Sequence, residues 1–355
     1  MTLLALIKGN TTFKEIYIWM QCSKNNTLLK KVFKKKVLKV PCKSTLHRLL
    51  VNVDNNELEK VFRDYFLKHT KRENIAIDGK WLNGSDVNAQ YTQQSHKAIL
   101  NVLDKDSQLV IAHKFLDHTK KSEIPAFTEL LKDEYFSNDT QIFTFDALLT
   151  QSEILNTIND QGSKYIAKLK GNQKHLRDKA ILTANNFVQP SNSYNDAHLN
   201  VTERHYRVTR EVDVFENRDC NIVMVQGAFK NIQSIIKITK TSTSFKTGEV
   251  KTKSEYLMAN YKSTAQEFRN KILQHWRVET YHYHLDSLME EDDHIAYINP
   301  FSISILRSFS VNLFQLFMNK HKEDKVLSPS TKTTMANIKN FCKHDDELVS
   351  ELLEQ

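Results

Sequence analysis

The sequence is organised around a long uninterrupted segment that contains His275-Trp276-Arg277-Val278-Glu279-Thr280-Tyr281-His282-Tyr283-His284-Leu285-Asp286. No proline or glycine occurs from Thr264 through this stretch, which predicts one continuous helix. Residues three or four positions apart lie on the same face of a helix. One such face gathers imidazole, phenol and carboxylate side chains, those of His275, Glu279, His282, Tyr283 and Asp286. We expect Trp276, Leu285 and Met289 to supply an apolar stripe. From this segment alone, the polar face is either a solvated helix surface or part of a functional site.

An apolar strand followed by an aspartate occurs twice before this helix. Asn74-Ile75-Ala76-Ile77-Asp78-Gly79-Lys80 predicts a short buried strand that ends at Asp78, and Gln141-Ile142-Phe143-Thr144-Phe145-Asp146 repeats the pattern. A single aspartate at a strand end is most simply a turn cap. Two of them, together with Glu279 on a long helix, are the parts of a divalent-metal site, because Mg²⁺ prefers oxygen ligands. Two such ions about 4 Å apart can hold the attacking and leaving oxygens of a phosphoryl transfer.

The order of the remaining elements predicts a mixed α/β sheet. Residues 96–103 and 108–115 are strand-like and are joined by the turn at 104–107, so with the first strand they make three antiparallel strands. The strand that ends at Asp146, a helix over 150–160 and a strand over 164–170 then form a β-α-β unit, which indicates a parallel portion.

The composition changes along the chain and suggests three regions. We expect a helical N-terminal domain over residues 1–70 that could bind DNA, a catalytic domain over 71–320 and a polar tail over 321–355. Within the catalytic domain, residues 175–263 have the character of a β-rich insertion.

The charge balance favours a polyanionic partner. The 355 residues include 50 Lys and Arg against 42 Asp and Glu, a net charge of +8 with a pI of about 9.0, and a basic chain of this kind is typical of nucleic-acid binding. Lysines and apolar residues alternate over residues 30–39. The basic residues that we predict to contact DNA phosphates are Lys34, Lys35, Lys36 and Arg48; the alternative is a solvated lysine-rich face.

Cysteine usage and hydropathy bear on the compartment. The four cysteines, Cys22, Cys42, Cys220 and Cys342, show neither metal-site spacing nor a disulfide framework, which is typical of a reducing cytoplasm. The apolar start of the chain is too short for a signal peptide, and we expect no membrane span.

Several of these stretches together resemble a known family. They are residues 75–80, Phe145-Asp146-Ala147, Tyr165-Ile166-Ala167-Lys168-Leu169-Lys170-Gly171-Asn172-Gln173 and His275-Trp276-Arg277-Val278-Glu279, continued by Leu285-Asp286 and Glu291-Asp292. In this order they resemble the H-repeat-associated transposases of bacterial insertion sequences, a DDE family with an RNase H-like catalytic core. The resemblance extends from about residue 3 to residue 318.

The resemblance implies an activity and a site. It implies that Asp78, Asp146 and Glu279 are the catalytic and metal-binding triad, with Mg²⁺ as the cofactor and Mn²⁺ as a possible substitute. The expected partner is double-stranded DNA, both element ends and target, with a homodimer pairing two ends in the cytoplasm at the nucleoid. The reaction would be cleavage at the element ends followed by joining of the 3′-hydroxyl to target DNA.

The loop at Gly171 carries polar side chains that could bind DNA. We expect Lys170, Asn172 and Gln173 to contact DNA near the scissile phosphate; the alternative is a plain strand-exit turn.

The chain departs from the family at several positions. Basic residues common in the family are replaced here, for example by Leu273 and Ile295, and the part before the first helix is shorter. A catalytically silent remnant that only binds DNA therefore stays open, as does an RNase H-like nuclease.

Overall fold

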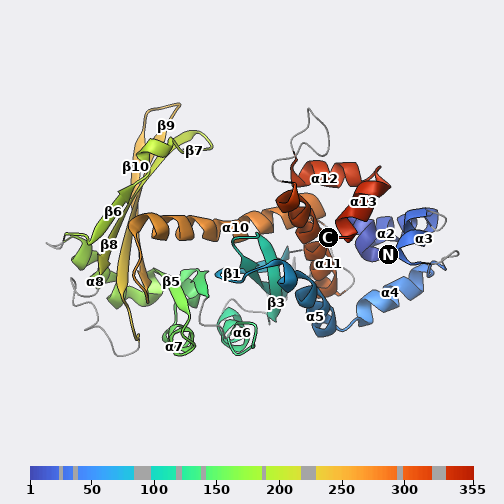
Figure 1. Ribbon diagram of the computed structural model, residues 1–355, viewed down its shortest axis with the longest axis horizontal. Helices are drawn as coiled ribbons and strands as arrows, with labels where there is room; N and C mark the ends of the chain where they lie inside the picture. The colour runs from blue at the N-terminus through green and yellow to red at the C-terminus, as the bar shows by residue number, and fades with distance from the viewer. Residues whose placement is uncertain are drawn as a thin grey trace, which may run out of the picture. The chain divides into compact units, whose positions relative to one another are not determined.

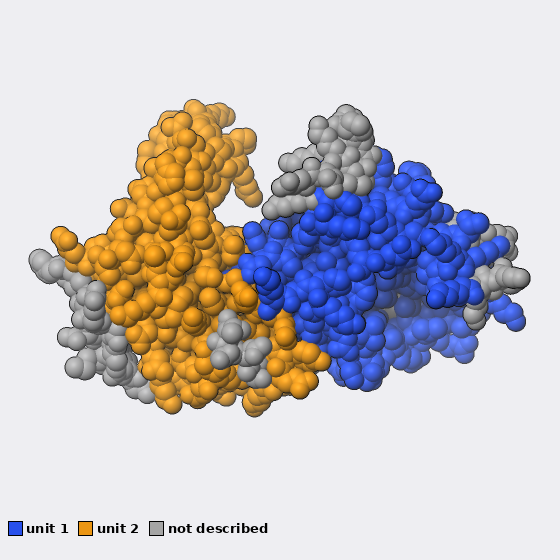
Figure 2. Space-filling view, in the orientation of Figure 1, with its two compact units in different colours: residues 1–71, 79–120, 277–355 blue, residues 72–78, 121–276 orange. Residues whose placement is uncertain are grey.

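The computed structural model describes residues 1–23, 27–34, 39–83, 97–116, 122–136, 141–185, 189–216, 229–293, 299–321 and 333–355. The chain divides into two compact units, coloured separately in Figure 2. Unit 1 comprises residues 1–71, 79–120 and 277–355, and unit 2 comprises residues 72–78 and 121–276. Strand β1 and helix α10 are each divided between the units, at residues 78/79 and 276/277.

The N-terminal part of unit 1 is helical, as its sequence predicts. Its helices are α1 Thr2–Ile7, α2 Phe13–Ser23, α3 Thr27–Val32, α4 Lys43–Asn52, α5 Asn55–Phe66 and the short 3-10 helix η1 Leu67–His69. Helix α5 begins at an Asp54 side chain that accepts hydrogen bonds from the backbone N–H groups of Asn56 and Glu57. Its fully buried Phe62 and Phe66 pack edge-on against Phe309 of the last core helix.

The rest of unit 1 contains a hairpin and the C-terminal helices (Figure 1). Strands β2 Lys97–Asp104 and β3 Leu109–Leu116 pair antiparallel, and the Asp104 side chain accepts from Ser107 in the predicted turn. Helices α11 Pro300–Lys320, α12 Met335–Cys342 and α13 Asp346–Leu353 follow. The two C-terminal helices bury apolar side chains such as Ile338 and Leu352.

Helix α11 is long and apolar enough to span a membrane by length and composition, contrary to our expectation of no such stretch. In unit 1, however, 72% of its most apolar window is buried. Asn312 also binds the backbone of Val110 through both an accepted and a donated hydrogen bond, at 3.1 and 2.7 Å. These contacts identify α11 as a core helix that is apolar because it is buried.

Unit 2 is built on a sheet with the strand order β1-β4-β5-β10-β9-β8-β6. The strands are β1 Asn74–Leu82, β4 Ile142–Phe145, β5 Lys164–Leu169, β10 Val250–Ala259, β9 Ser234–Ser244, β8 Tyr206–Glu216 and β6 Asn192–Asn195, with β7 Thr202–Glu203 beside β8. Strands β1, β4 and β5 run parallel, and β10 pairs antiparallel with β5. Helices α6 Glu123–Leu130 and α7 Ser152–Asp160 provide the crossovers. The predicted mixed α/β sheet with a parallel portion is confirmed.

The β-rich insertion begins with a helix that we did not anticipate, α8 Lys174–Asn185. It contains no glycine or proline and leads into the long strands β8, β9 and β10 (Figure 1). Their inward side chains, including Val212, Ile236 and Leu257, pack with Phe268 of α10 in one apolar cluster. The strand-like residues 222–225 lie outside the described part of the chain.

Two details differ from the sequence predictions. Strand β1 does not end at Asp78 but continues to Leu82, because Lys80 and Leu82 on alternate positions are both buried. Helix α10, Ala265–Met289, is continuous as predicted. Trp276, however, is 55% exposed and Leu285 is buried. Nine residues separate the two, about half a turn beyond two full turns, so they lie on opposite faces.

Candidate active site

The predicted aspartates occupy matching positions on neighbouring parallel strands of unit 2. Ile77 of β1 pairs with Phe145 of β4. Asp78 is the next residue of β1, and Asp146 is the first residue after β4. Neighbouring strands are about 4.8 Å apart, and residues in register point to the same face. The two carboxylates therefore lie side by side on one face of the sheet, Asp78 half-buried and Asp146 exposed.

Alternation along β4 separates this polar face from an apolar one. Phe143 and Phe145 point to the opposite side, where both rings contact Phe127 of α6. On the aspartate side, the buried Thr144 donates its hydroxyl proton to the carbonyl of Ile75. The same oxygen lies 3.1 Å from Nδ1 of His275 on α10. A hydroxyl has one proton, so Thr144 accepts from a protonated Nδ1.

Helix α10 and the strands run in the same direction within unit 2. Lys271 of α10 donates to the Asn74 side chain at the start of β1, at 2.7 Å. One helical turn later, His275 contacts Thr144, which pairs with Ala76 two residues further along β1. The N-terminal half of α10 therefore lies along the aspartate face of β1 and β4 and advances with them.

Asp146 forms an ion pair with a lysine of the neighbouring strand end. The Lys170 ammonium lies 3.2 Å from Oδ2 and 3.4 Å from Oδ1 of Asp146. Burial alone raises the pKa of Asp146, but the hydrogen bond and charge of Lys170 outweigh this effect, with smaller contributions from Ala147 N–H and Lys168. The pKa of Asp146 is therefore below its usual value, and the carboxylate is ionised at neutral pH.

The two amides that we expected to touch DNA donate to the backbone beside Asp146. The chain after Asp146 forms a short 3-10 helix, η4 Ala147–Leu149. Nδ2 of Asn172 donates to the carbonyl of Ala147, and Nε2 of Gln173 donates to that of Thr150 at 2.8 Å. The Gly171 loop, itself the 3-10 helix η5 Gly171–Gln173, thus holds the segment that follows Asp146.

Glu279 belongs to unit 1, on the C-terminal half of α10. Its side chain is exposed, whereas the neighbouring Val278 and Tyr281 are buried. One turn further, Nε2 of His282 is hydrogen-bonded to Nδ2 of Asn101 on β2 at 3.0 Å. His275 and His282 thus make specific polar contacts, each within its own unit.

The donor set fits a hard divalent cation. Asp78 and Asp146 supply two adjacent carboxylates, the number that Mg²⁺ commonly takes from a protein while keeping several waters. Across the part of the chain that the structure describes, no group of three or more His, Cys, Asp or Glu side chains is already gathered for a metal ion. In unit 2, Asp78 and Asp146 are thus the two candidate carboxylates for a metal ion.

Two of the N-terminal basic residues predicted to bind DNA belong to the described part of unit 1. Lys34 follows α3 with a positive φ of 50° and is exposed, and Arg48 is exposed on α4. Lys35 and Lys36 lie outside the described residues. Lys34 and Arg48 thus both belong to unit 1 and are open to solvent.

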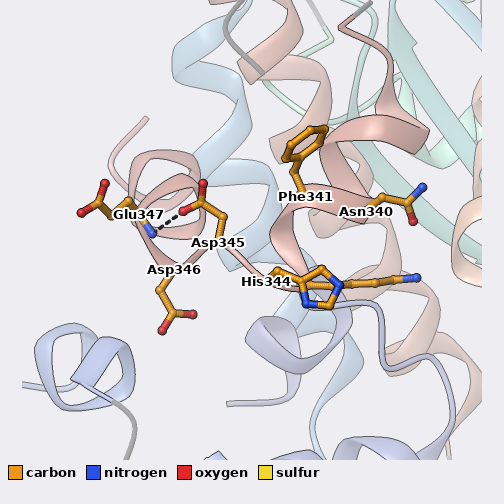
Figure 3. A pocket seen from close by; sticks show the side chains of 7 residues that line it. Asn340, Phe341, His344, Asp345, Asp346 and Glu347 are labelled. Atoms are coloured by element: carbon orange, nitrogen blue, oxygen red, sulfur yellow. Dashed lines mark hydrogen bonds between the residues drawn. The ribbon is translucent and has the colours of Figure 1, made fainter. Parts of the chain in front are cut away.

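Unit 1 has a surface pocket at its C-terminal helices. Figure 3 shows it at the turn between α12 and α13, lined by Asn340, Phe341, Lys343, His344, Asp345, Asp346 and Glu347. The Asp345 carboxylate accepts from the N–H groups of Glu347 and Leu348, at 2.9 and 3.0 Å. It is therefore the N-cap of α13, a structural role.

Sequence reasoning gave no role to two buried polar residues of β1 and β4. In the sequence, Thr144 is an ordinary strand residue. Its hydrogen bond to His275 depends on how α10 packs against β4, which the sequence pattern does not show. Lys80 belonged to a quoted motif but received no role, although it is buried among carboxylates in unit 1. The signal for Lys80 was its position two residues after Asp78, on the same face of one strand.

A family model for the Transposase DDE domain matches residues 68–302, about two thirds of the chain. The chain belongs to the DDE transposase family. This match includes both aspartates, the insertion and Glu279. The mixed sheet, with its β2–β3 hairpin and parallel β1, β4 and β5, agrees with the RNase H-like core expected of this transposase family.

Two relatives of this DDE-family chain are proteins of Escherichia coli. YncI of strain O157:H7, a candidate transposase, is 26% identical over 264 residues, which are 71% of this chain and 65% of that protein. YhhI of strain K12, a candidate transposase associated with the H repeat, is 26% identical over 179 residues, 48% of this chain and 46% of that protein. The chain thus spans less than two thirds of the length of each.

One solved structure covers almost the whole DDE transposase chain. The piggyBac transposase in a synaptic complex with hairpin DNA aligns with 99% of this chain and 70% of its own, with a TM-score of 0.48 and 12% identity.

Proposed function

We propose that this chain is a metal-dependent DNA transposase of an insertion sequence. It would cleave phosphodiester bonds at the element ends and join the 3′-hydroxyl to target DNA. The observation that carries the proposal is the matched position of Asp78 and Asp146 on two parallel strands, in a chain that belongs to the DDE family.

Asp78, Asp146 and Glu279 are the proposed metal ligands. Lys271 and His275 of α10 contact positions 74 and 144. Four residues of a helix advance about 6 Å, close to the roughly 6.6 Å of two strand residues. Since α10 is continuous, Glu279 lies one turn after His275 on the same face of the helix.

Bound Mg²⁺, or Mn²⁺ in its place, would supply the charge that activates the attacking oxygen and stabilises the leaving one. Four polar side chains would support the elements that carry the proposed ligands. Thr144 and His275 fix α10 against β4, while Asn172 and Gln173 fix the turn after Asp146. Lys170, bound to Asp146 by a half-exposed ion pair, is free to turn to a DNA phosphate once a metal takes the carboxylate.

Double-stranded DNA is the proposed partner, with two copies of the chain pairing the two element ends in the cytoplasm. Lys34 and Arg48, with Lys35 and Lys36, would neutralise phosphates away from the reacting bond. These contacts would add affinity without base specificity.

The test is cleavage of DNA that carries the inverted repeats flanking the reading frame, with and without Mg²⁺. We expect metal-dependent nicks at the repeat ends and strand-transfer products, both abolished in Asp146→Asn and in Glu279→Gln. DNA binding without cleavage would identify a silent remnant instead. Cleavage without strand transfer would favour an RNase H-like nuclease.

A further inference from the structure

Lys80 is a buried cation surrounded by carboxylates, and all of its partners lie in unit 1. It is 6% exposed, and its Nζ lies 2.7 Å from Asp286, 3.3 Å from Asp292 and 3.7 Å from Glu291. Asp286 is on α10, whereas Glu291 and Asp292 follow the end of that helix. The cluster therefore ties β1 to the C-terminal end of α10.

The charges of the cluster depend on one another. Burial lowers the pKa of Lys80, but the charges of Glu291, Asp286 and Asp292 outweigh it and keep the ammonium protonated. Glu291 is 3% exposed, and burial raises its pKa against the opposing charges of Arg307 and Lys80. Removing one partner alone would leave a buried charge uncompensated, which is far more costly than replacing the whole pair.

The cluster shares its two elements with the proposed metal ligands. Lys80 is two residues after Asp78, so both point to the same face of β1. Asp286 is seven residues after Glu279, close to two helical turns, so both lie on the same face of α10. A 2.7 Å contact between Lys80 and Asp286 thus fixes, within unit 1, the end of β1 against the half of α10 that carries Glu279.

We propose that Lys80 and Asp286 are positioning residues: within unit 1, their ion pair holds the half of α10 that carries Glu279 against the end of β1, in the position from which Glu279 would bind a metal ion. The inference rests on the proposed function, because it assumes that Glu279 is a metal ligand. A buried ion pair adds little net stability over an apolar pair of similar volume, so its contribution here is geometry. Asp292 supports it by accepting from the N–H and side-chain amide of Asn83, at 3.2 and 3.0 Å.

The experiment measures Mn²⁺ affinity by calorimetry on the full chain, together with DNA cleavage and thermal unfolding. Asp286→Asn removes the charge from a side chain that is 40% exposed. Lys80 keeps Glu291 and Asp292 as charged partners in this variant, so we expect the fold to stay intact. Lys80→Met combined with Asp286→Leu replaces the pair by apolar groups and preserves packing. We expect both variants to weaken Mn²⁺ binding and to slow cleavage by about 10- to 100-fold, the usual effect of losing a residue that supports a metal ligand.

Lys320→Met is the matched control, because Lys320 forms an exposed ion pair with Glu351 in the same unit; its Mn²⁺ affinity should equal that of the parent. If Lys80→Arg binds Mn²⁺ like the parent while Lys80→Met binds it more weakly, the positive charge at this position is what positions the helix. A folded double variant that binds Mn²⁺ like the parent would overturn the inference. A parent whose Mn²⁺ binding is unaffected by Asp146→Asn would instead overturn the proposed function, and the inference with it.

Discussion

At the scale of single residues, the Lys170 ammonium forms an ion pair with Asp146, a carboxylate of the proposed metal site. A lysine this close to a metal ligand competes with the cation for the same carboxylate. Both side chains are about half-exposed, 51% and 52%, so solvent screens the pair and limits its strength.

We expect Lys170→Met to bind Mn²⁺ more tightly and to cleave DNA more slowly. The affinity should rise by about two- to fivefold, because an exposed ion pair is worth up to about 1 kcal/mol. Cleavage should fall because the charge proposed to contact phosphate is removed. Calorimetry and a cleavage assay measure the two effects, with the exposed Lys174 on the next helix replaced by Met as the control. Unchanged Mn²⁺ affinity would show that Lys170 does not compete with the metal.

His113 makes a second residue-scale prediction, on pH and stability. It is 4% exposed, with Nε2 3.1 Å from the hydroxyl of Ser308, and burial lowers its pKa from 6.5 to about 3. Between these values the unfolded state binds a proton that the folded state does not, so stability is greatest above pH 6.5 and falls as the pH drops. The expected slope is about 1.4 kcal/mol per pH unit for this residue.

Urea unfolding of the parent and of His113→Gln, at about pH 7 and about pH 5, tests this dependence. The variant should lose less free energy of unfolding between the two pH values than the parent does. His47→Gln, on the exposed side of α4, should behave like the parent. Equal pH dependence in parent and His113→Gln would mean that His113 is protonated in the folded chain.

At the scale of elements, the η5 loop supports the segment that follows the β4 strand. Asn172 and Gln173 come directly after β5, the parallel neighbour of β4. Their amides reach across to carbonyls in and just after η4, so two adjacent strand ends are joined by side-chain hydrogen bonds. This geometry follows from the shared carboxyl edge of parallel strands.

Replacing Asn172 and Gln173 by Ala should therefore lower both stability and cleavage. Each missing hydrogen bond is expected to cost about 1 kcal/mol in the free energy of unfolding. Cleavage should fall further than stability explains, with Mn²⁺ affinity retained, because Asp78 and Asp146 remain in place. Asn195→Ala, at the exposed end of β6, is the control. If the folded Asn172→Ala, Gln173→Ala variant cleaves DNA like the parent, the loop is a plain strand-exit turn with no role in cleavage.

At the scale of the whole molecule, the basic charge of the chain bears on the proposed binding of DNA. The net charge of +8 includes the lysine-rich segment after α3, and both Lys34 and Arg48 are exposed. Contacts to phosphates release bound cations, which makes the affinity depend on salt.

We expect Lys34→Ala with Arg48→Ala to weaken binding to duplex DNA of any sequence. The slope of log affinity against log salt should fall by about 0.9 for each phosphate that the variant no longer neutralises. Fluorescence anisotropy at several salt concentrations measures this, and Lys320→Met serves again as the control. A parental slope in the double variant would assign these residues to a solvated face.

The sequence by itself determined the elements and the carboxylates. Uninterrupted helical spacing predicted α10, and the strand–helix–strand pattern after residue 141 predicted that β4 and β5 are parallel, because these patterns depend on residues close together in the chain. Family motifs then indicated the chemistry. Local patterns also misplaced two features, the end of β1 and the exposure of Trp276, since burial depends on which elements pack together.

Only the tertiary structure decided how the polar groups pair. The bond between Thr144 and His275 joins residues 131 positions apart, and the Lys80 cluster joins β1 to residues more than 200 positions away. Such partners are selected by the packing of α10 against the strands, and no spacing in the sequence encodes that packing. In the sequence, Lys80 cannot be told from a solvated surface lysine. Its burial beside three carboxylates matters because a charge that is removed from water is costly unless it is paired.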